Sequence, residues 1–232
     1  MLSKANLNIF FNTWWNWLSV GMVSNLANFV YTAFKAYTPD VILILDKKAE
    51  ESAIRSDKIS ELVYHELSHA SHFTKVGSSF WNRYVNAVIN NAFKDFNDPY
   101  GDCKKNEGDL ISLSESWAYY RGYFITWTKY NQYSQYWNQY YWSKLEDDIW
   151  YSCMSYQVYF DLWDGPYEGT TNGVVDEVNG GDYHNPNFTN RKMFDCLEPQ
   201  IDAPYKYRDL FIQRYGSSQA SAIRKLYQSY GL

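Results

Sequence analysis

Three of the four histidines in this chain fall within residues 65–72, inside a segment that is typical of an amphipathic helix. Residues 56–75 repeat apolar side chains every three or four positions, so one face of the predicted helix must pack against the rest of the protein. His65 and His69 lie four positions apart, and helical geometry places such side chains on one face, one turn apart. The segment therefore predicts a helix that holds two imidazoles at a fixed separation.

This helix is expected to bury an apolar face made of Ile59, Leu62, Val63, Leu67, Ala70 and Phe73. His65 and His69 fall at the border of that face, and Glu66 projects beside it. A carboxylate among apolar neighbours has a raised pKa, which suits a general base that works near neutral pH. His72 lies about 10 Å beyond His65 along the helix axis, too far to share one ion with it, and is interpreted as a cleft-lining or surface residue.

The string His65-Glu66-x-x-His69 has the spacing at which two imidazoles share one tetrahedral zinc ion, while the Glu between them acts on a metal-bound water. A catalytic zinc ion usually has three protein ligands, so another side chain is needed. The downstream candidates are Glu107, Asp109, Glu115, Glu146, Asp147, Asp148, Asp161, Asp164 and His184.

Glu115 is the preferred third ligand. It lies in the middle of residues 110–124, which are typical of a helix buried on two faces, and a buried carboxylate needs a partner. Ala118 and Gly122 share its face, and such small residues let a second helix approach closely. A buried salt bridge of Glu115, for example with Arg121, is one alternative, and a different downstream carboxylate as the ligand is the other.

His65-Glu66-x-x-His69 followed by a helical Glu115-Ser-Trp-Ala resembles the zincin metallopeptidases, specifically the gluzincins, whose third ligand is a Glu. The resemblance covers roughly residues 38–125. It implies that His65, His69 and Glu115 bind zinc and that Glu66 is the general base and later the proton donor. Zinc would lower the pKa of its bound water and polarise the scissile carbonyl of a peptide or protein substrate.

The resemblance also implies a fold that is mainly α, an α+β zincin-like arrangement in which a short edge strand precedes the active-site helix. Residues 41–45 read as a buried strand and would pair with an extended substrate backbone. The chain departs from the family in the 45 residues that separate His69 from Glu115. It departs again at Tyr119, where some members place an Asp beside a zinc histidine, so the partners of the ligands stay unassigned.

The oxyanion that develops during hydrolysis needs a donor besides the metal. Tyr183 and His184 are the candidates, because they lie in residues 180–186, a Gly-rich segment that can reach over a cleft. An ordinary surface-loop histidine is the alternative interpretation of His184.

The chain has 232 residues and is expected to form one domain, 1–232, with a full core. Its 10 Trp, 23 Tyr and 13 Phe make up 20% of the sequence, so aromatic rings must fill much of that core. Strand patterns beyond residues 41–45 are scarce, so part of a zincin sheet would lie upstream of Met1 and the chain would then be a fragment. Further helices are expected over residues 8–35, 79–93, 144–162, 205–215 and 217–229, and a long loop is expected over 164–206. The aromatic run 130–142 is expected to pack against neighbouring helices, and a platform that binds peptide or glycan is the alternative.

A net charge of −5 with scattered basic residues argues against nucleic acid as a partner. No stretch is apolar and long enough to span a membrane, and residues 1–35 lack a signal-peptide pattern. Cys103, Cys153 and Cys196 allow one disulfide and one free thiol, with no pairing indicated. The composition resembles that of secreted or surface-anchored bacterial hydrolases, which implies an extracytoplasmic location, and nothing in it indicates an oligomeric state.

These patterns favour a zinc-dependent metallopeptidase. A catalytically inactive module of zincin ancestry that binds peptide or glycan is the alternative, and a zinc hydrolase of non-peptide amides is the third. Glu66 favours catalysis, because a binding site has no need of a general base.

Overall fold

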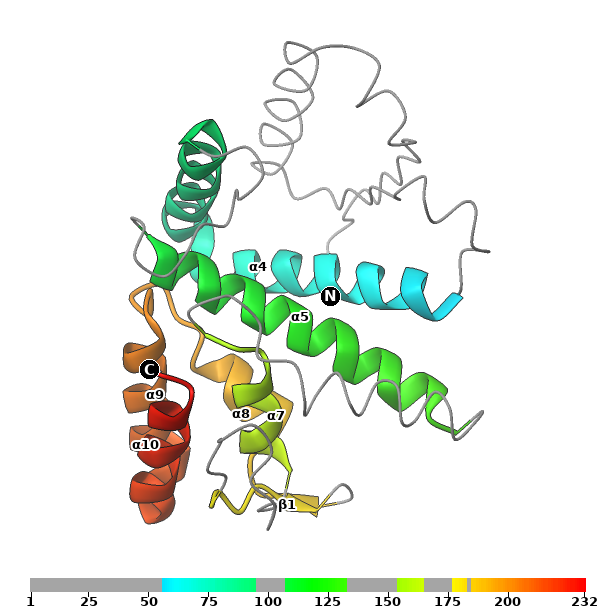
Figure 1. The fold of residues 1–232 in the computed structure, drawn as a ribbon, viewed down its shortest axis with the longest axis vertical. Helices are drawn as coiled ribbons and strands as arrows, with labels where there is room; N and C mark the ends of the chain where they lie inside the picture. The colour runs from blue at the N-terminus through cyan, green and yellow to red at the C-terminus, as the bar shows by residue number, and fades with distance from the viewer. Residues whose placement is uncertain (1–55, 95–106, 133–153, 165–176, 183–184) are drawn as a thin grey trace.

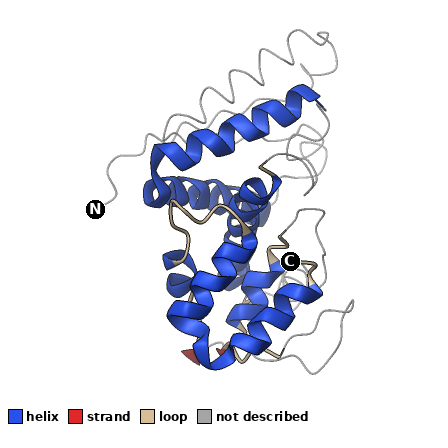
Figure 2. Ribbon diagram, turned by 90° about the vertical axis from the view of Figure 1, so that its left-hand side faces the viewer, coloured by secondary structure: helices blue, strands red, loops and turns tan. Residues whose placement is uncertain are grey.

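The computed structural model of this chain describes residues 56–94, 107–132, 154–164, 177–182 and 185–232. These residues are mainly helical, as the sequence predicted (Figures 1 and 2). The longer elements are α4 (Ser56–Lys94), α5 (Gly108–Tyr130), α7 (Gln157–Trp163), α8 (Asn190–Asp195), α9 (Pro204–Phe211) and α10 (Ala220–Ser229). A π-helical turn, η1 (Ile212–Gly216), and a 3-10 turn, η2 (Ser217–Gln219), join α9 to α10. The strands among the described residues are β1 (Gly181–Asp182) and β2 (Asn185–Pro186), which pair antiparallel.

Helix α4 changes direction at Gly77, whose φ of 78° and ψ of 176° are not helical. Glycine adopts positive φ without the steric cost that a side chain would add. The helices predicted over 56–75 and 79–93 correspond to the two halves of α4 on either side of this break. The second half therefore leaves the axis of the first (Figure 1).

Helix α5 packs along the first half of α4 and runs in the opposite direction (Figure 1). Glu115 therefore lies beside His69, whereas Gly122, two turns later, lies beside His65. The helix predicted over 110–124 is confirmed and extends a few residues at each end. Its buried polar residues besides Glu115 are Ser112, Ser114, Ser116 and Thr126.

The face of α4 that the sequence was expected to bury is not the buried one. Ile59, Leu62 and Leu67 are 36%, 37% and 39% exposed. The buried positions of the first half of α4 are instead Asp57, Ser60, Ser68, His72 and Val76. The reason is the position of α5, which docks on the side of α4 that carries the imidazoles and small polar residues. A hydroxyl there is satisfied locally, as when Ser68 donates to the carbonyl of Tyr64 over 2.6 Å.

Aromatic rings fill the core, as the composition predicted. The main cluster joins α5 to α7, α8, α9 and α10, and its largest fully buried side chains include Tyr120, Tyr159, Phe160, Tyr207, Phe211 and Tyr227. A second cluster lies where the second half of α4 meets the start of α5, and it contains Phe80, Trp81, Tyr84, Leu110 and Ile111. Helix α5 contributes to both clusters and is thereby held between them.

The predicted long loop over 164–206 contains a short helix, α8, so that prediction was wrong over 190–195. Thr189 caps this helix by accepting a hydrogen bond from the backbone of Lys192 over 3.3 Å. Of the predicted helix 144–162, the structure describes residues 154–162, and these are helical only from Gln157. The predicted helix 8–35, the edge strand 41–45, Cys103, Cys153 and most of the aromatic run 130–142 lie outside the described residues.

Among the residues described, no helix combines the length and the hydropathy needed to cross a bilayer. Among the described residues, the cysteine is Cys196, whose thiol is free and buried.

Candidate metal centre

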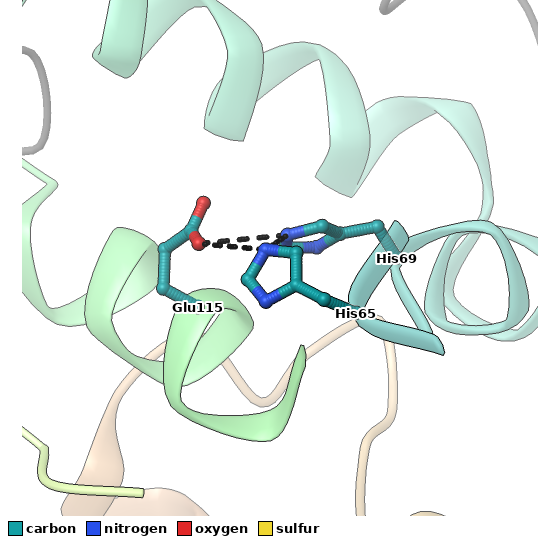
Figure 3. A group of neighbouring side chains, drawn as sticks. All are labelled: His65, His69 and Glu115. Carbon is teal, nitrogen blue, oxygen red and sulfur yellow. Dashed lines mark hydrogen bonds and ion pairs between the residues drawn. The ribbon is translucent and has the colours of Figure 1, made fainter. Parts of the chain in front are cut away.

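His65 and His69 project from α4 toward Glu115 of α5, and the three side chains meet at one point (Figure 3). The Nε2 atoms of the two imidazoles are 3.1 Å apart. Glu115 Oε2 lies 3.6 Å from His65 Nε2 and 3.5 Å from His69 Nε2. The two helices therefore bring three potential ligand atoms into a nearly equilateral triangle.

The dimensions of this triangle match the coordination shell of a single ion. In a tetrahedral site with metal–ligand bonds of about 2.0–2.1 Å, the ligand atoms lie about 3.3–3.4 Å from each other. The observed separations of 3.1, 3.5 and 3.6 Å lie around that value. The three side chains could hold a metal ion as they stand.

The charge of Glu115 is the strongest indication that a cation belongs here. Its side chain is 2% exposed, and Oε2 has no hydrogen-bond donor among the described residues. Burial alone would raise the pKa of Glu115, but attraction to His69 and His65 and a hydrogen bond from Tyr84 outweigh it and lower the pKa to about 2. A buried carboxylate that stays ionised needs positive charge beside it, which a protonated imidazole or a bound metal ion can supply.

The two imidazoles are 12% and 11% exposed and differ in their protonation. Burial and repulsion from His69 lower the pKa of His65 to about 3, so His65 is neutral at physiological pH and offers a lone pair. Burial also acts to lower the pKa of His69, but Glu115 and Glu66 outweigh it and raise that pKa. A metal ion binding to His69 at mildly acidic pH must therefore displace a proton.

Glu66 follows His65 on α4 and is not one of the three grouped ligands, but it interacts electrostatically with His69 and Glu115. Burial raises the pKa of Glu66 to about 7, although His69 opposes the shift and Glu115 adds to it. The raised pKa expected from the sequence is therefore confirmed. A carboxylate with a pKa near neutrality can both accept and return a proton.

Aromatic rings surround the imidazoles. The ring of Tyr119 meets His65 edge-on with centroids 4.4 Å apart, and Trp81 and Tyr84 lie 5.7 and 6.0 Å from His69. Tyr119 occupies the position where the resembled family places an Asp, and it contacts His65 through its ring. These rings limit the rotation of both imidazoles and keep their Nε2 atoms directed at Glu115.

Gly122 sets the distance between the two helices. A Cβ atom at this position would lie 2.9 Å from the carbonyl oxygen of Glu61 and 3.3 Å from the Cβ of His65. Contacts this short exclude any side chain, so the close approach predicted from Ala118 and Gly122 is confirmed at Gly122. The glycine allows α5 to lie near enough for Glu115 to reach the imidazoles.

Arg121, the alternative salt-bridge partner of Glu115, and two of the alternative metal ligands have other contacts. Arg121 lies over the rings of Trp117 and Phe124, and the ion-pair contacts of Glu115 are those with the two histidines. Two of the other candidate ligands are also committed, because Glu107 pairs with Arg83 over 2.8 Å and Asp161 accepts a hydrogen bond from Tyr230 over 2.7 Å.

Tyr183 and His184, the predicted oxyanion donors, lie outside the described residues. The strands that flank them, β1 and β2, lie at the lower end of the view, below α7 and α8 and away from the region where α4 packs on α5 (Figure 1). Their role stays a prediction.

His72 is fully buried, so its interpretation as a cleft-lining or surface residue was wrong. Its ring lies 5.1 Å from Phe80 and 6.1 Å from Trp81, and neither of its nitrogens has a hydrogen-bond partner among the described residues. Burial is the main cause that lowers the pKa of His72 to about 3. The error follows from the reversed face of α4, which places His72 against the rings of Phe80 and Trp81 beyond the Gly77 break.

The sequence analysis missed Tyr84, whose hydroxyl donates to Glu115 Oε1. Tyr84 lies beyond the Gly77 break, so no helical spacing relates it to the histidines. Only the change in direction of α4 brings it to the site.

Comparisons of the chain with protein-family models, with curated protein sequences and with solved structures found no match. The function is therefore inferred from the geometry and chemistry of the site.

Proposed function

We propose that this protein is a zinc-dependent metallopeptidase whose centre is formed by His65, His69 and Glu115. The single observation that carries the proposal is the triangle of Nε2, Nε2 and Oε2 atoms at 3.1–3.6 Å. Two imidazoles and one carboxylate from two helices suit one ion, and the residue that follows His65 is a carboxylate of raised pKa.

The donor set favours zinc over calcium and magnesium. Calcium and magnesium take mainly oxygen ligands, whereas two imidazoles and one carboxylate form a set found in catalytic zinc sites. Three protein ligands leave a fourth position open, as a catalytic site requires.

When bound, zinc supplies an acidified water and a polarised substrate carbonyl. The chain's own residues supply the rest of the chemistry. His65 and His69 would hold the ion through Nε2, and Glu115 would hold it through Oε2. Glu66 accepts a proton from the attacking water on its carboxylate and delivers it to the amine of the leaving peptide.

The same residues are similar to the gluzincin pattern, and this similarity supports peptides or proteins as substrates. In this proposal residues 41–45 provide the edge strand of an α+β zincin-like fold and pair with the substrate backbone. The proposal includes an extracytoplasmic location, which rests on the composition of the chain alone.

The test combines metal content with peptide cleavage. Purified protein should contain about one zinc ion per chain, and His65→Ala and Glu115→Ala should each remove it. Glu66→Gln should keep the zinc and abolish cleavage of a mixture of unstructured peptides, read by mass spectrometry. Glu61→Gln is the matched control on the same helix, because Glu61 pairs with Lys58 away from the ion, and it should keep both properties.

Two results would overturn the proposal. Folded parent protein that binds no zinc would remove the metal centre, and Glu66→Gln protein that cleaves as fast as the parent would remove the assigned base. Zinc-loaded parent that binds peptides or glycans without cleaving them would instead identify a binding module derived from such an enzyme.

A further inference from the structure

The two oxygens of the Glu115 carboxylate have different surroundings. Oε2 faces the Nε2 atoms of His65 and His69 at 3.6 and 3.5 Å. Oε1 accepts a hydrogen bond from the hydroxyl of Tyr84. One oxygen is therefore directed at the ion site, while the other is held by a neutral donor.

Tyr84 is placed for this contact by the fold. Its side chain is 8% exposed and packs on Trp81, with ring centroids 4.8 Å apart. It belongs to the second half of α4, which reaches α5 because Gly77 redirects the helix. The hydroxyl is thus delivered by a ring that is already fixed, and little side-chain entropy is lost in making the hydrogen bond.

We propose that Tyr84 is a positioning residue that commits Glu115 to bind the metal ion through Oε2 alone. The inference rests on the proposed metal centre and is independent of the reaction catalysed there. A free carboxylate can chelate an ion with both oxygens, which adds a ligand and fills a coordination position. The Tyr84 hydroxyl competes for Oε1 and so preserves the open position that substrate needs.

The hydroxyl also strengthens the site electrostatically. A phenol that donates to a carboxylate stabilises its ionised form, and the Tyr84 hydroxyl donates to Glu115 Oε1. The ligand is therefore ionised and oriented before the ion arrives, which reduces the cost of ordering it on binding.

The test is Tyr84→Phe in the full chain, which removes the hydroxyl and keeps the ring. The zinc dissociation constant should rise about 10–100-fold, as is typical when the hydrogen-bonding partner of a metal ligand is lost. With cobalt in place of zinc, the visible absorption should weaken in the variant, because a second carboxylate oxygen raises the coordination number. Tyr207→Phe is the matched control: it removes a buried hydroxyl that donates to the Met193 carbonyl over 2.9 Å in the α9 packing, and it should change neither property.

The outcomes separate this role from the centre itself. If Tyr84→Phe binds zinc with the parent's affinity and gives the parent's cobalt spectrum, the role of Tyr84 is wrong and the metal centre stands. If Tyr207→Phe loses as much zinc affinity as Tyr84→Phe, the effect is one of general destabilisation, and the role of Tyr84 is also overturned. Parent protein that binds no metal would overturn both the centre and this inference.

A measurement on the unaltered chain covers the case in which Tyr84→Phe does not fold. The infrared difference spectrum between zinc-loaded and zinc-free parent isolates the carboxylate that binds the ion. Widely separated carboxylate stretches, as expected for binding through one oxygen, would support the role of Tyr84. Closely spaced stretches, as expected for chelation, would overturn it.

Discussion

Glu115 Oε2 lies 3.5 Å from His69 Nε2, although 45 residues separate these two side chains in the chain. The contact places an ionised carboxylate, 2% exposed, against two imidazoles. Such a charge is costly to bury alone, and the surrounding residues satisfy only one of its oxygens. The three side chains could together hold a metal ion.

Zinc should stabilise the folded protein, because the ligand set exists only in the folded state. At a free zinc concentration 100 times the dissociation constant, the expected gain is about 2.7 kcal/mol. Thermal unfolding with and without zinc measures it. Glu115→Ala should lose the gain, whereas Ser114→Ala, at a neighbouring buried position, should keep it. Equal gains in both variants would contradict the assignment of Glu115.

The rate of peptide cleavage should fall as pH decreases, because Glu66 accepts a proton only when ionised. Burial raises the pKa of Glu66 to about 7, and a bound dication would lower it. The acid limb of kcat/KM should thus have a midpoint between the ordinary Glu value of 4.5 and about 7. Initial rates measured between about pH 4 and about pH 9 locate this midpoint. A rate independent of pH across this window would exclude Glu66 as the base.

Gly122→Ala should destabilise the protein and weaken zinc binding. Helix propensity alone favours Ala by about 1 kcal/mol, but the added Cβ would lie 2.9 Å from the carbonyl oxygen of Glu61. Helix α5 must move away from α4, which carries Glu115 away from the imidazoles. Urea unfolding and zinc titration of the variant test this. A variant more stable than the parent, with unchanged zinc affinity, would show that the helix spacing is not set at Gly122.

The metal-free protein should lose stability as pH falls below 6.5, with His72 as one cause. Its folded pKa of about 3 lies below its ordinary value of 6.5, so the unfolded chain binds the proton first. Stability is therefore fully present above pH 6.5 and declines toward pH 3, by as much as about 1.4 kcal/mol per pH unit for this group. His65, with a similar shift, adds to the slope.

Substitution of the buried histidine should reduce that slope. His72→Leu removes the titrating group and two ring nitrogens that have no partner among the described residues. Urea unfolding at several pH values compares the variant with the parent. The same slope in both proteins would mean that His72 is not buried as a neutral imidazole.

Two leucines should respond differently to truncation because they occupy opposite environments. Leu67 is 39% exposed on α4, whereas Leu113 is fully buried in the aromatic core. Leu113→Ala should cost about 2–5 kcal/mol, and Leu67→Ala should cost less than about 1 kcal/mol. Equal costs, measured by denaturant unfolding, would indicate that the apolar face of α4 is buried after all.

The sequence was sufficient for the features that depend on neighbours in the chain. The spacing of His65 and His69 predicted their common direction, and the pattern over 110–124 predicted the helix that carries Glu115. Gly122 was visible as a close-approach position. These predictions hold because helix geometry converts a local pattern directly into direction and contact.

The chain by itself determined which side chains could serve as ligands, and the tertiary structure decided how they are used. Amphipathicity distinguishes two faces of α4, but it does not specify which of them α5 covers. For this reason the exposure of Leu67 and the burial of His72 were not predicted. Tyr84 reaches Glu115 only because α4 changes direction at Gly77. Docking depends on the summed packing of surfaces distant in sequence, and no short-range periodicity encodes that sum.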